Sequence, residues 1–313
     1  MSRRSAATVD SRDSPWTGGA WAWLRTPDRR FLVLAILLQL ALAAIPLHRS
    51  YDRTVFEAAG YLVATGHSPY VPQDLSAVFH AAFFRDFATI GYPPPWPLLL
   101  GGIYRVTYAV VPNLQLYAVA IKLPVIAAGI GLAYLSGASL HNLGAAPLLV
   151  RRAWLAILFN PFLIYVAAVR GQIDPIVAVL ALAAVLLVAS GRRDLSAVTV
   201  ALAVCVKPTA APLLLAVLLA IAAVSLPRAL RYAAVVTAGV FAFYVVPFFI
   251  LGWDGSPLHQ ANSQFALAGA MSPATIARVW TDPVVLDGHW WLLGLLWIPS
   301  LVIATVLVRR GAC

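Results

Sequence analysis

Long apolar runs are the feature that most constrains this chain. It has 313 residues, of which 61% are hydrophobic and only 11% are charged, whereas soluble domains carry about 25% charged residues. Several runs approach the roughly 20 residues that a helix needs to cross a lipid bilayer. The sequence therefore predicts an all-α polytopic membrane protein.

The net charge of +10 does not indicate a nucleic-acid-binding protein. Arginines stand in pairs at the ends of apolar runs, which is typical of topology signals and not of a DNA-binding surface. The cysteines, Cys205 and Cys313, form no metal-binding or redox motif. The sequence contains no phosphate-binding loop, dinucleotide fingerprint, HExxH or GxSxG motif. We therefore expect no nucleotide-driven pump.

The apolar segments define a topology. They lie at about 31–47, 95–111, 115–137, 153–169, 174–190, 195–208, 210–225, 230–251 and 290–308. If all of them crossed the membrane, Arg151 and Arg152 would face away from the cytoplasm, against the preference of arginine for that side. The segment at 95–111 overlaps the proline-rich stretch "GYPPPWPLLLGG", and consecutive prolines break helix hydrogen bonding. We assign it as a juxtamembrane or re-entrant helix.

This assignment leaves about eight transmembrane helices, with both termini cytoplasmic, in a plasma (inner) membrane. Residues 1–30 are polar and are expected to form a disordered cytoplasmic tail without a cleaved signal peptide. Residues 31–313 would form one membrane domain with two long extracytoplasmic loops, 48–114 and 252–289. Because functional residues concentrate on such loops, we expect the chemistry on the outer face.

The first outer loop places Asp52 just before a predicted helix at 53–65, which Gly66 would terminate. Asp52 is a candidate catalytic acid or base, but it also suits the N-cap of this helix. The only glutamate, Glu57, lies roughly 140° around the helix from Asp52, so a carboxylate pair is not expected. Glu57 is interpreted as a solvated or structural residue. An apolar face is expected to lie on the membrane, formed by Val55, Ala58, Ala59 and Leu62.

Polar residues also gather where two later helices would meet the outer face. Arg170, Gln172 and Asp174 lie in "RGQID", and three polar groups at one membrane depth are costly unless they serve a function. Asp174 before Pro175 equally fits the start of a helix. Lys207, in "CVKPT", either extends to the membrane surface or binds a lipid phosphate.

Two further positions are weaker candidates. Lys122 lies inside an apolar segment, where it needs a partner or water, and is a second candidate phosphate ligand. His259 stands in a polar and aromatic stretch of the last outer loop, where it can bind sugar hydroxyls or belong to an ordinary loop.

These pieces suggest a class of chemistry. Nucleotides are scarce outside the cytoplasm, so an enzyme there must take its activated group from a membrane substrate. An aspartate at the surface can act as general base on a hydroxyl, and cations such as Lys207 and Arg170 can stabilise a departing phosphate.

The order of these pieces resembles the polytopic GT-C glycosyltransferases, and most closely the bacterial polyprenol-phosphate-mannose-dependent mannosyltransferases. The resemblance covers about residues 31 to 225. It is carried by Asp52, "GHSPY" at 66–70, "YPPPWP" at 92–97, "NPFLIYVAAVRGQID" at 160–174 and "KPT" at 207–209.

The resemblance implies a helical bundle with juxtamembrane helices in the first outer loop. Asp52 would be the base for the acceptor hydroxyl, and Tyr70, Tyr92, Gln172 and Asp174 would bind substrate. The donor would be a sugar, commonly mannose, on a polyprenyl phosphate, and direct displacement would invert the anomeric carbon. The acceptor would be an envelope glycan or glycolipid.

Some relatives use a divalent cation, so Mg²⁺ or Mn²⁺ is a possible cofactor. Family members are often longer, and this chain is expected to be a compact or shortened one.

Two other interpretations compete. A transporter or lipid-linked-sugar flippase would use Lys122, Arg170 and Asp174 as charges along its pathway, although we see no inverted repeat. A non-catalytic membrane subunit would not need Asp52.

Overall fold

The computed structural model describes residues 29–45, 51–85 and 89–253. Within these ranges the chain is helical and contains no strand. Most of the predicted tail at 1–30, nearly all of the outer loop at 252–289 with His259, and the apolar segment at 290–308 lie outside them.

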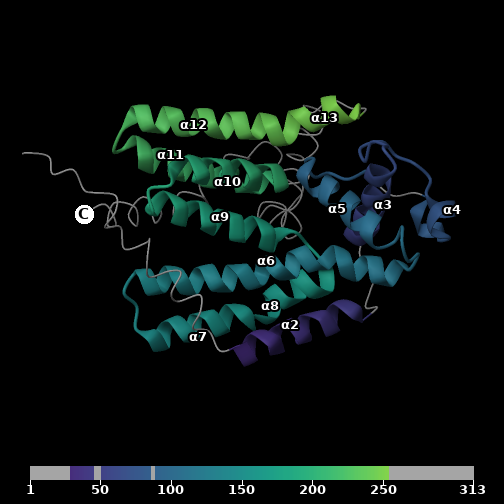
Figure 1. Cartoon of the computed structure of the whole chain (residues 1–313), viewed down its shortest axis with the longest axis horizontal. Coiled ribbons are helices and arrows are strands. Elements are labelled where there is room, and N and C mark those ends of the chain that lie inside the picture. Colours follow the sequence, from purple (N-terminus) through teal and green to yellow (C-terminus); the bar gives the residue numbers. More distant parts are fainter. Residues whose placement is uncertain (1–28, 46–50, 86–88, 254–313) are drawn as a thin grey trace, which may run out of the picture.

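Most helices lie side by side in a bundle, and the helices formed by residues 51–106 gather at one end of it (Figure 1). Helices α2 (Arg29–Ala44), α6 (Leu114–Asn142) and α7 (Pro147–Leu158) form one side of the bundle. The other side consists of α9 (Asp174–Ala189), α10 (Arg193–Val206), α11 (Ala211–Ala222) and α12 (Leu226–Val240). The predicted apolar segments in this part of the chain are therefore helical.

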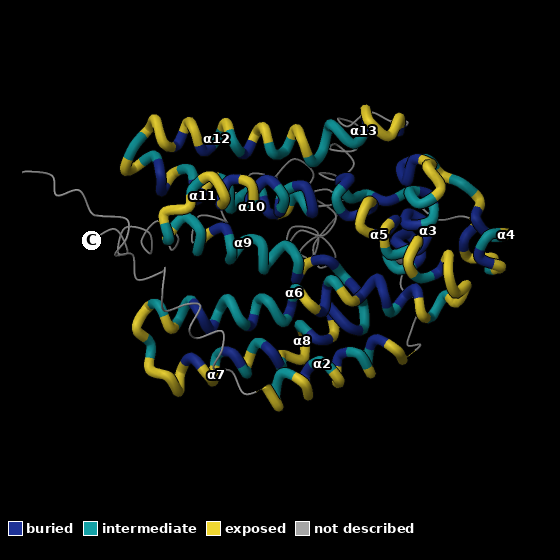
Figure 2. Tube along the Cα trace, viewed as in Figure 1, coloured by how far each residue is buried: buried dark blue, intermediate teal, exposed yellow. Residues whose placement is uncertain are grey.

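Three helical segments among the described residues are long and apolar enough to cross a membrane: Leu114–Asn142, Pro147–Arg170 and Leu226–Leu251. Asp174–Ala189 and Pro208–Ala222 are apolar but shorter. Large apolar side chains such as Leu37, Leu148 and Phe249 are exposed, and exposed residues follow the outer faces of α2, α7 and α12 (Figure 2). This apolar exterior is typical of a protein surrounded by lipid.

The second of these segments is interrupted at the sequence "NPF", residues 160–162. After α7 ends, the Asn160 side chain accepts hydrogen bonds from the amides of Phe162 and Leu163 at 2.9 and 3.1 Å. Pro161 then starts the short helix α8 (Pro161–Ile164), which continues into the π-helical segment η3 (Tyr165–Arg170). The asparagine cap therefore restarts the helix that the proline interrupts.

Helices α3 (Tyr51–Ala64), α4 (Ser76–Phe79) and α5 (Pro95–Val106) form the end cluster. With 12 residues, α5 is about 18 Å long and too short to cross a membrane core of about 30 Å. It packs along α3, and Arg105 of α5 donates a hydrogen bond to the carbonyl of Ala64 at 3.0 Å.

Two predictions about α3 are wrong. The helix begins at Tyr51, so Asp52 lies in its first turn and not at its N-cap. The apolar face of Val55, Ala58, Ala59 and Leu62 is buried in the protein core and does not lie on the membrane, because α5 and α6 cover it. The predicted stop is confirmed: Gly66 has φ of +82°, a conformation that favours glycine.

Gly60 allows α3 to approach its neighbours. A Cβ atom at this position would collide with the Tyr117 hydroxyl of α6 and would lie 2.8 Å from the Leu100 carbonyl of α5. The same hydroxyl donates a hydrogen bond to the carbonyl of Glu57 at 3.2 Å. A larger residue at Gly60 would therefore push α3 off both helices.

We expect Gly60→Ala to lower the free energy of unfolding by about 1–3 kcal/mol, the usual cost of overpacking a core. Gly102→Ala on α5 is the matched control, because a Cβ atom added there would meet nothing within 4 Å. Thermal unfolding of the purified protein in detergent measures both. Equal melting temperatures for Gly60→Ala and the unsubstituted protein would contradict this packing.

Candidate active site

The carboxylate of Asp52 faces a polar turn from a distant part of the chain. Gln172 donates a hydrogen bond from Nε2 to Asp52 Oδ2 at 3.3 Å, and Arg170 Nη2 lies 4.0 Å from the same oxygen. The Asp52 side chain is 28% exposed and that of Arg170 is 41% exposed, so both remain accessible. Residues separated by about 120 positions thus meet at the end of the bundle that carries α3.

The turn that carries Arg170 and Gln172 depends on Gly171. This residue has φ of +68°, which favours glycine, and a Cβ atom added to it would lie 3.1 Å from Lys122 Cγ. The amide of Gln172 donates to the Val166 carbonyl at 3.0 Å. These constraints hold the turn in the orientation that brings Gln172 to Asp52.

Arg170 has an unused donor in the described part of the chain. Its Nε atom is buried and has no hydrogen-bond partner there, and its contact with Asp52 is long at 4.0 Å. An arginine whose side chain is 41% exposed and only loosely paired is suited to binding a carboxylate or phosphate group.

A second charged pair lies next to the turn. Lys207 Nζ contacts Asp174 Oδ1 at 2.6 Å, with the lysine side chain 21% exposed and that of Asp174 half-exposed. Asp174 lies in the first turn of α9, where a negative charge is favoured by the helix dipole. Lys207 is an extended residue between α10 and the short 3₁₀ helix η4 (Pro208–Ala210).

The negative charges of Asp52 and Asp174 both act on the hydroxyl of Tyr92. Burial raises the pKa of its hydroxyl, and the negative charges of Asp52 and Asp174 raise it further. Tyr92 therefore stays protonated and can act as a hydrogen-bond donor near both carboxylates.

Tyr70 holds the backbone at Tyr92 through a hydrogen bond. Its hydroxyl donates to the Tyr92 carbonyl at 3.1 Å, and its buried ring stacks on Phe248 with centroids 5.1 Å apart. Burial also raises the pKa of Tyr70. The structure thus places Tyr70 where it positions the loop of Tyr92.

Lys122 lies beneath the turn and not at its surface. It is 6% exposed, and its ammonium donates to the Ala43 carbonyl at 3.2 Å. Its aliphatic chain contacts Gly171. This position fits a support for the 170–174 turn more directly than the phosphate contact predicted from the sequence.

Sequence reasoning missed the polar network that anchors α3. Arg53 contacts the buried carboxylate of Glu57 at 2.8 Å and donates to Gln115 Oε1 at 3.3 Å, while Gln115 donates to the Ala44 carbonyl at 2.8 Å. The structural alternative for Glu57 is therefore correct. The four-residue spacing of Arg53 and Glu57 was the available signal.

The donor set does not fit a divalent cation well. The described residues contain no group of three or more His, Cys, Asp or Glu side chains that could hold a metal ion. Asp52 and Asp174 each face a cationic side chain already, and hard cations prefer several oxygen ligands. We derive no catalytic step through a metal.

Six of the predicted site residues lie in one region of the structure: Asp52, Arg170, Gln172, Asp174, Lys207 and Tyr92. Tyr70 and Lys122 are buried next to this group. His259 lies outside the described residues.

Comparison with known proteins identifies a family. The model of glycosyltransferase family 87 matches residues 91–312, a range that contains the 170–174 turn and Lys207 but begins after Asp52 and Tyr70. No curated protein and no solved structure matches the chain. Nothing in the comparisons supports the transporter interpretation. The chain belongs to glycosyltransferase family 87 and is a membrane glycosyltransferase of the GT-C type.

Proposed function

We propose that the protein transfers a sugar, with mannose as the leading candidate, from a polyprenyl-phosphate donor to a hydroxyl group of an envelope glycan or glycolipid. The reaction takes place on the outer face of the plasma membrane. Family membership supports glycosyl transfer. The lipid-linked donor follows from the resemblance to polyprenol-phosphate-mannose-dependent enzymes and from the position of the cations at the end of the apolar helices.

One observation carries the proposal most directly. An accessible carboxylate, Asp52, lies 4.0 Å from the guanidinium of Arg170, and a second cation, Lys207, pairs with Asp174 at the end of the same turn. A base for the acceptor and positive charge for the leaving phosphate are the two groups that this transfer requires.

The chemistry is a single displacement. The acceptor oxygen forms a bond to the anomeric carbon while the bond from that carbon to the phosphate oxygen breaks. Asp52 takes the proton of the acceptor hydroxyl, and the polyprenyl phosphate leaves with the electron pair. Attack from the face opposite the leaving group inverts the anomeric centre.

The neighbouring side chains have separate roles in this scheme. Gln172 holds the Asp52 carboxylate by its 3.3 Å hydrogen bond. Arg170, whose side chain is 41% exposed, binds the phosphate, and Lys207 adds a second positive charge from the α10 end. Tyr92, protonated, donates to a substrate oxygen, and we retain Asp174 and His259 as candidate sugar ligands.

Asp52→Asn tests the base. Asparagine keeps the shape but cannot take a proton, so we expect transfer to fall roughly 100-fold or more. Membranes supplied with labelled polyprenyl-phosphate-mannose measure the rate. Asp74→Asn is the control, because Asp74 is an exposed acid of the same loop that bonds only Ser76 among the described residues.

Wild-type transfer that persists in Asp52→Asn would contradict the role of Asp52. Transfer from a polyprenyl-phosphate-glucose donor and none from the mannose donor would overturn the choice of sugar while leaving the base intact.

Arg170→Gln tests the phosphate contact. Loss of the guanidinium removes charge that stabilises the leaving group, and we expect kcat to fall roughly 10–1,000-fold, with partial recovery in Arg170→Lys. Arg85→Gln is the control, since Arg85 is an exposed arginine of the outer loop. An unchanged kcat for Arg170→Gln, with normal folding by gel filtration, would remove Arg170 from the mechanism.

A further inference from the structure

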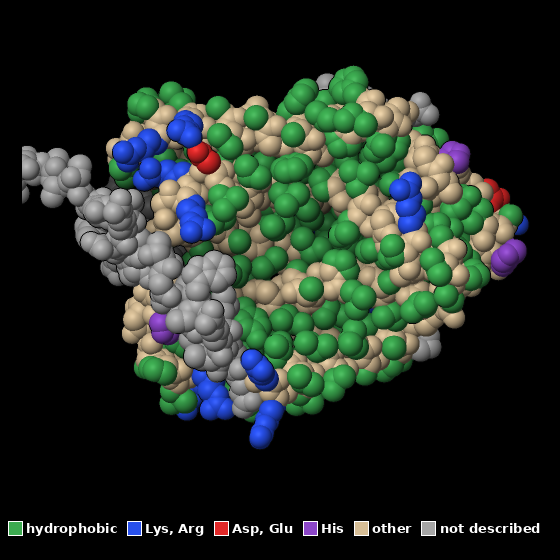
Figure 3. Space-filling view, viewed as in Figure 1, with side chains coloured by type: hydrophobic (Ala, Val, Ile, Leu, Met, Phe, Trp, Pro, Cys, Tyr) green, Lys and Arg blue, Asp and Glu red, His purple; other side chains and the backbone are tan. Residues whose placement is uncertain are grey.

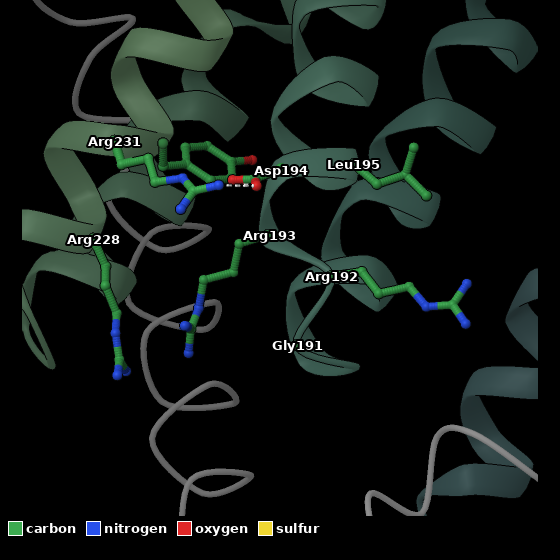
Figure 4. Close-up of a pocket in the computed structure, with 8 residues that line it drawn as sticks. Gly191, Arg192, Arg193, Asp194, Leu195, Arg228 and Arg231 are labelled. Atoms are coloured by element: carbon green, nitrogen blue, oxygen red, sulfur yellow. Dashed lines mark hydrogen bonds and ion pairs between the residues drawn. The ribbon is translucent and has the colours of Figure 1, made fainter. Parts of the chain in front are cut away.

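Arginines surround a cavity at the end of the bundle opposite the candidate active site. The cavity has a volume of about 330 Å³, and its lining includes Arg192, Arg193, Asp194, Arg228, Arg231 and Tyr232. It lies where α9 turns into α10 and where α12 begins (Figures 1 and 4). The 16 residues of α9, about 24 Å of helix, separate it from Asp174.

The charges in this arginine pocket are unbalanced. Its lining has four arginines and one acid, which leaves three positive charges. Asp194 forms an ion pair with Arg231, and within the described ranges no acid pairs with Arg192, Arg193 or Arg228. In Figure 4, Arg193 and Arg228 extend side by side from α10 and α12.

Two helices also begin at the arginine pocket. Neither α10, which starts at Arg193, nor α12, which starts at Leu226, has a side-chain cap on its N-terminus. The positive ends of two helix dipoles add to the arginine charge. A phosphate group suits this combination better than a carboxylate, because it has more oxygens to share among the donors.

Apolar side chains adjoin the charges. Leu195 is 51% exposed, and Leu226 and Leu230 are each 62% exposed. Figure 3 shows Lys and Arg side chains at this end of the molecule and a largely hydrophobic surface beside them. A ligand with an anionic head and an apolar tail would contact both groups.

Membrane topology alone accounts for basic residues near this end. Topology does not require arginines from two different helices to line one cavity. Arg151 and Arg152 on α7, for example, do not line this pocket. We propose that the arginine pocket binds the phosphate of an anionic phospholipid from the membrane leaflet opposite the candidate active site.

The bound lipid joins the N-terminal ends of α10 and α12. Because a ligand that binds only the folded protein stabilises it by mass action, an anionic lipid should raise the melting temperature. This effect is independent of sugar transfer, so it can be measured without a donor or an acceptor.

The experiment compares purified full-length protein in detergent with added phosphatidylglycerol, phosphatidylcholine or inorganic phosphate. Native mass spectrometry gives the apparent affinity, and thermal unfolding gives the stabilisation. We expect phosphatidylglycerol to bind and stabilise and phosphatidylcholine to do neither. The double variant Arg193→Gln/Arg228→Gln should weaken phosphatidylglycerol binding at least tenfold.

The matched control is Arg151→Gln/Arg152→Gln, which removes the same charge at the same end of the bundle (Figure 1) and should keep the affinity. Asp194→Asn tests the pocket in the other direction: it frees Arg231 from its ion pair and should tighten binding.

Equal binding of the two lipids, or equal loss in both double variants, would overturn the proposal. Saturation by inorganic phosphate that excludes the lipid would assign the pocket to a free phosphate compound.

Discussion

The turn at Gly171 is the constraint on which the candidate active site depends. It holds Arg170 and Gln172 against Asp52 only because the backbone there adopts a left-handed conformation directly over the Lys122 side chain. The ammonium of that lysine is buried and bonded to the end of α2. A polar group inside an apolar bundle is costly unless it is bonded, and here the bond joins α6 to α2 beneath the turn that contacts Asp52.

The apolar runs were sufficient to locate the described long helices, because length and hydropathy are properties of a single segment. The turns at Gly66, Asn160 and Lys207 were also predictable, since glycine and proline act on the local backbone. The contact between Asp52 and Gln172 depends on packing between segments about 120 residues apart. Separate motifs pointed to each residue, but no local pattern gave their distance.

Where prediction failed or left a choice open, the environment of a side chain was the missing information. The apolar face of α3 suits a membrane surface and a protein core equally well. Packing against α5 makes this face part of the protein core. Lys122 looked like a possible phosphate ligand because a sequence does not show which way an ammonium points. The arginines of the 191–194 loop looked like a topology signal alone, until the start of α12 brought Arg228 and Arg231 beside them.

The short length of α9 has a consequence for the membrane. At about 24 Å, its 16 residues do not span a hydrocarbon core of about 30 Å. Either the bilayer thins around this helix or one polar end lies below the lipid headgroups. Thinning brings the headgroup layer closer in depth to the pair of Asp174 and Lys207, whereas the second arrangement leaves a polar end of α9 below the headgroups. Under the proposed function, a donor phosphate attached to a long lipid can reach the site in either case while its chain stays in the membrane.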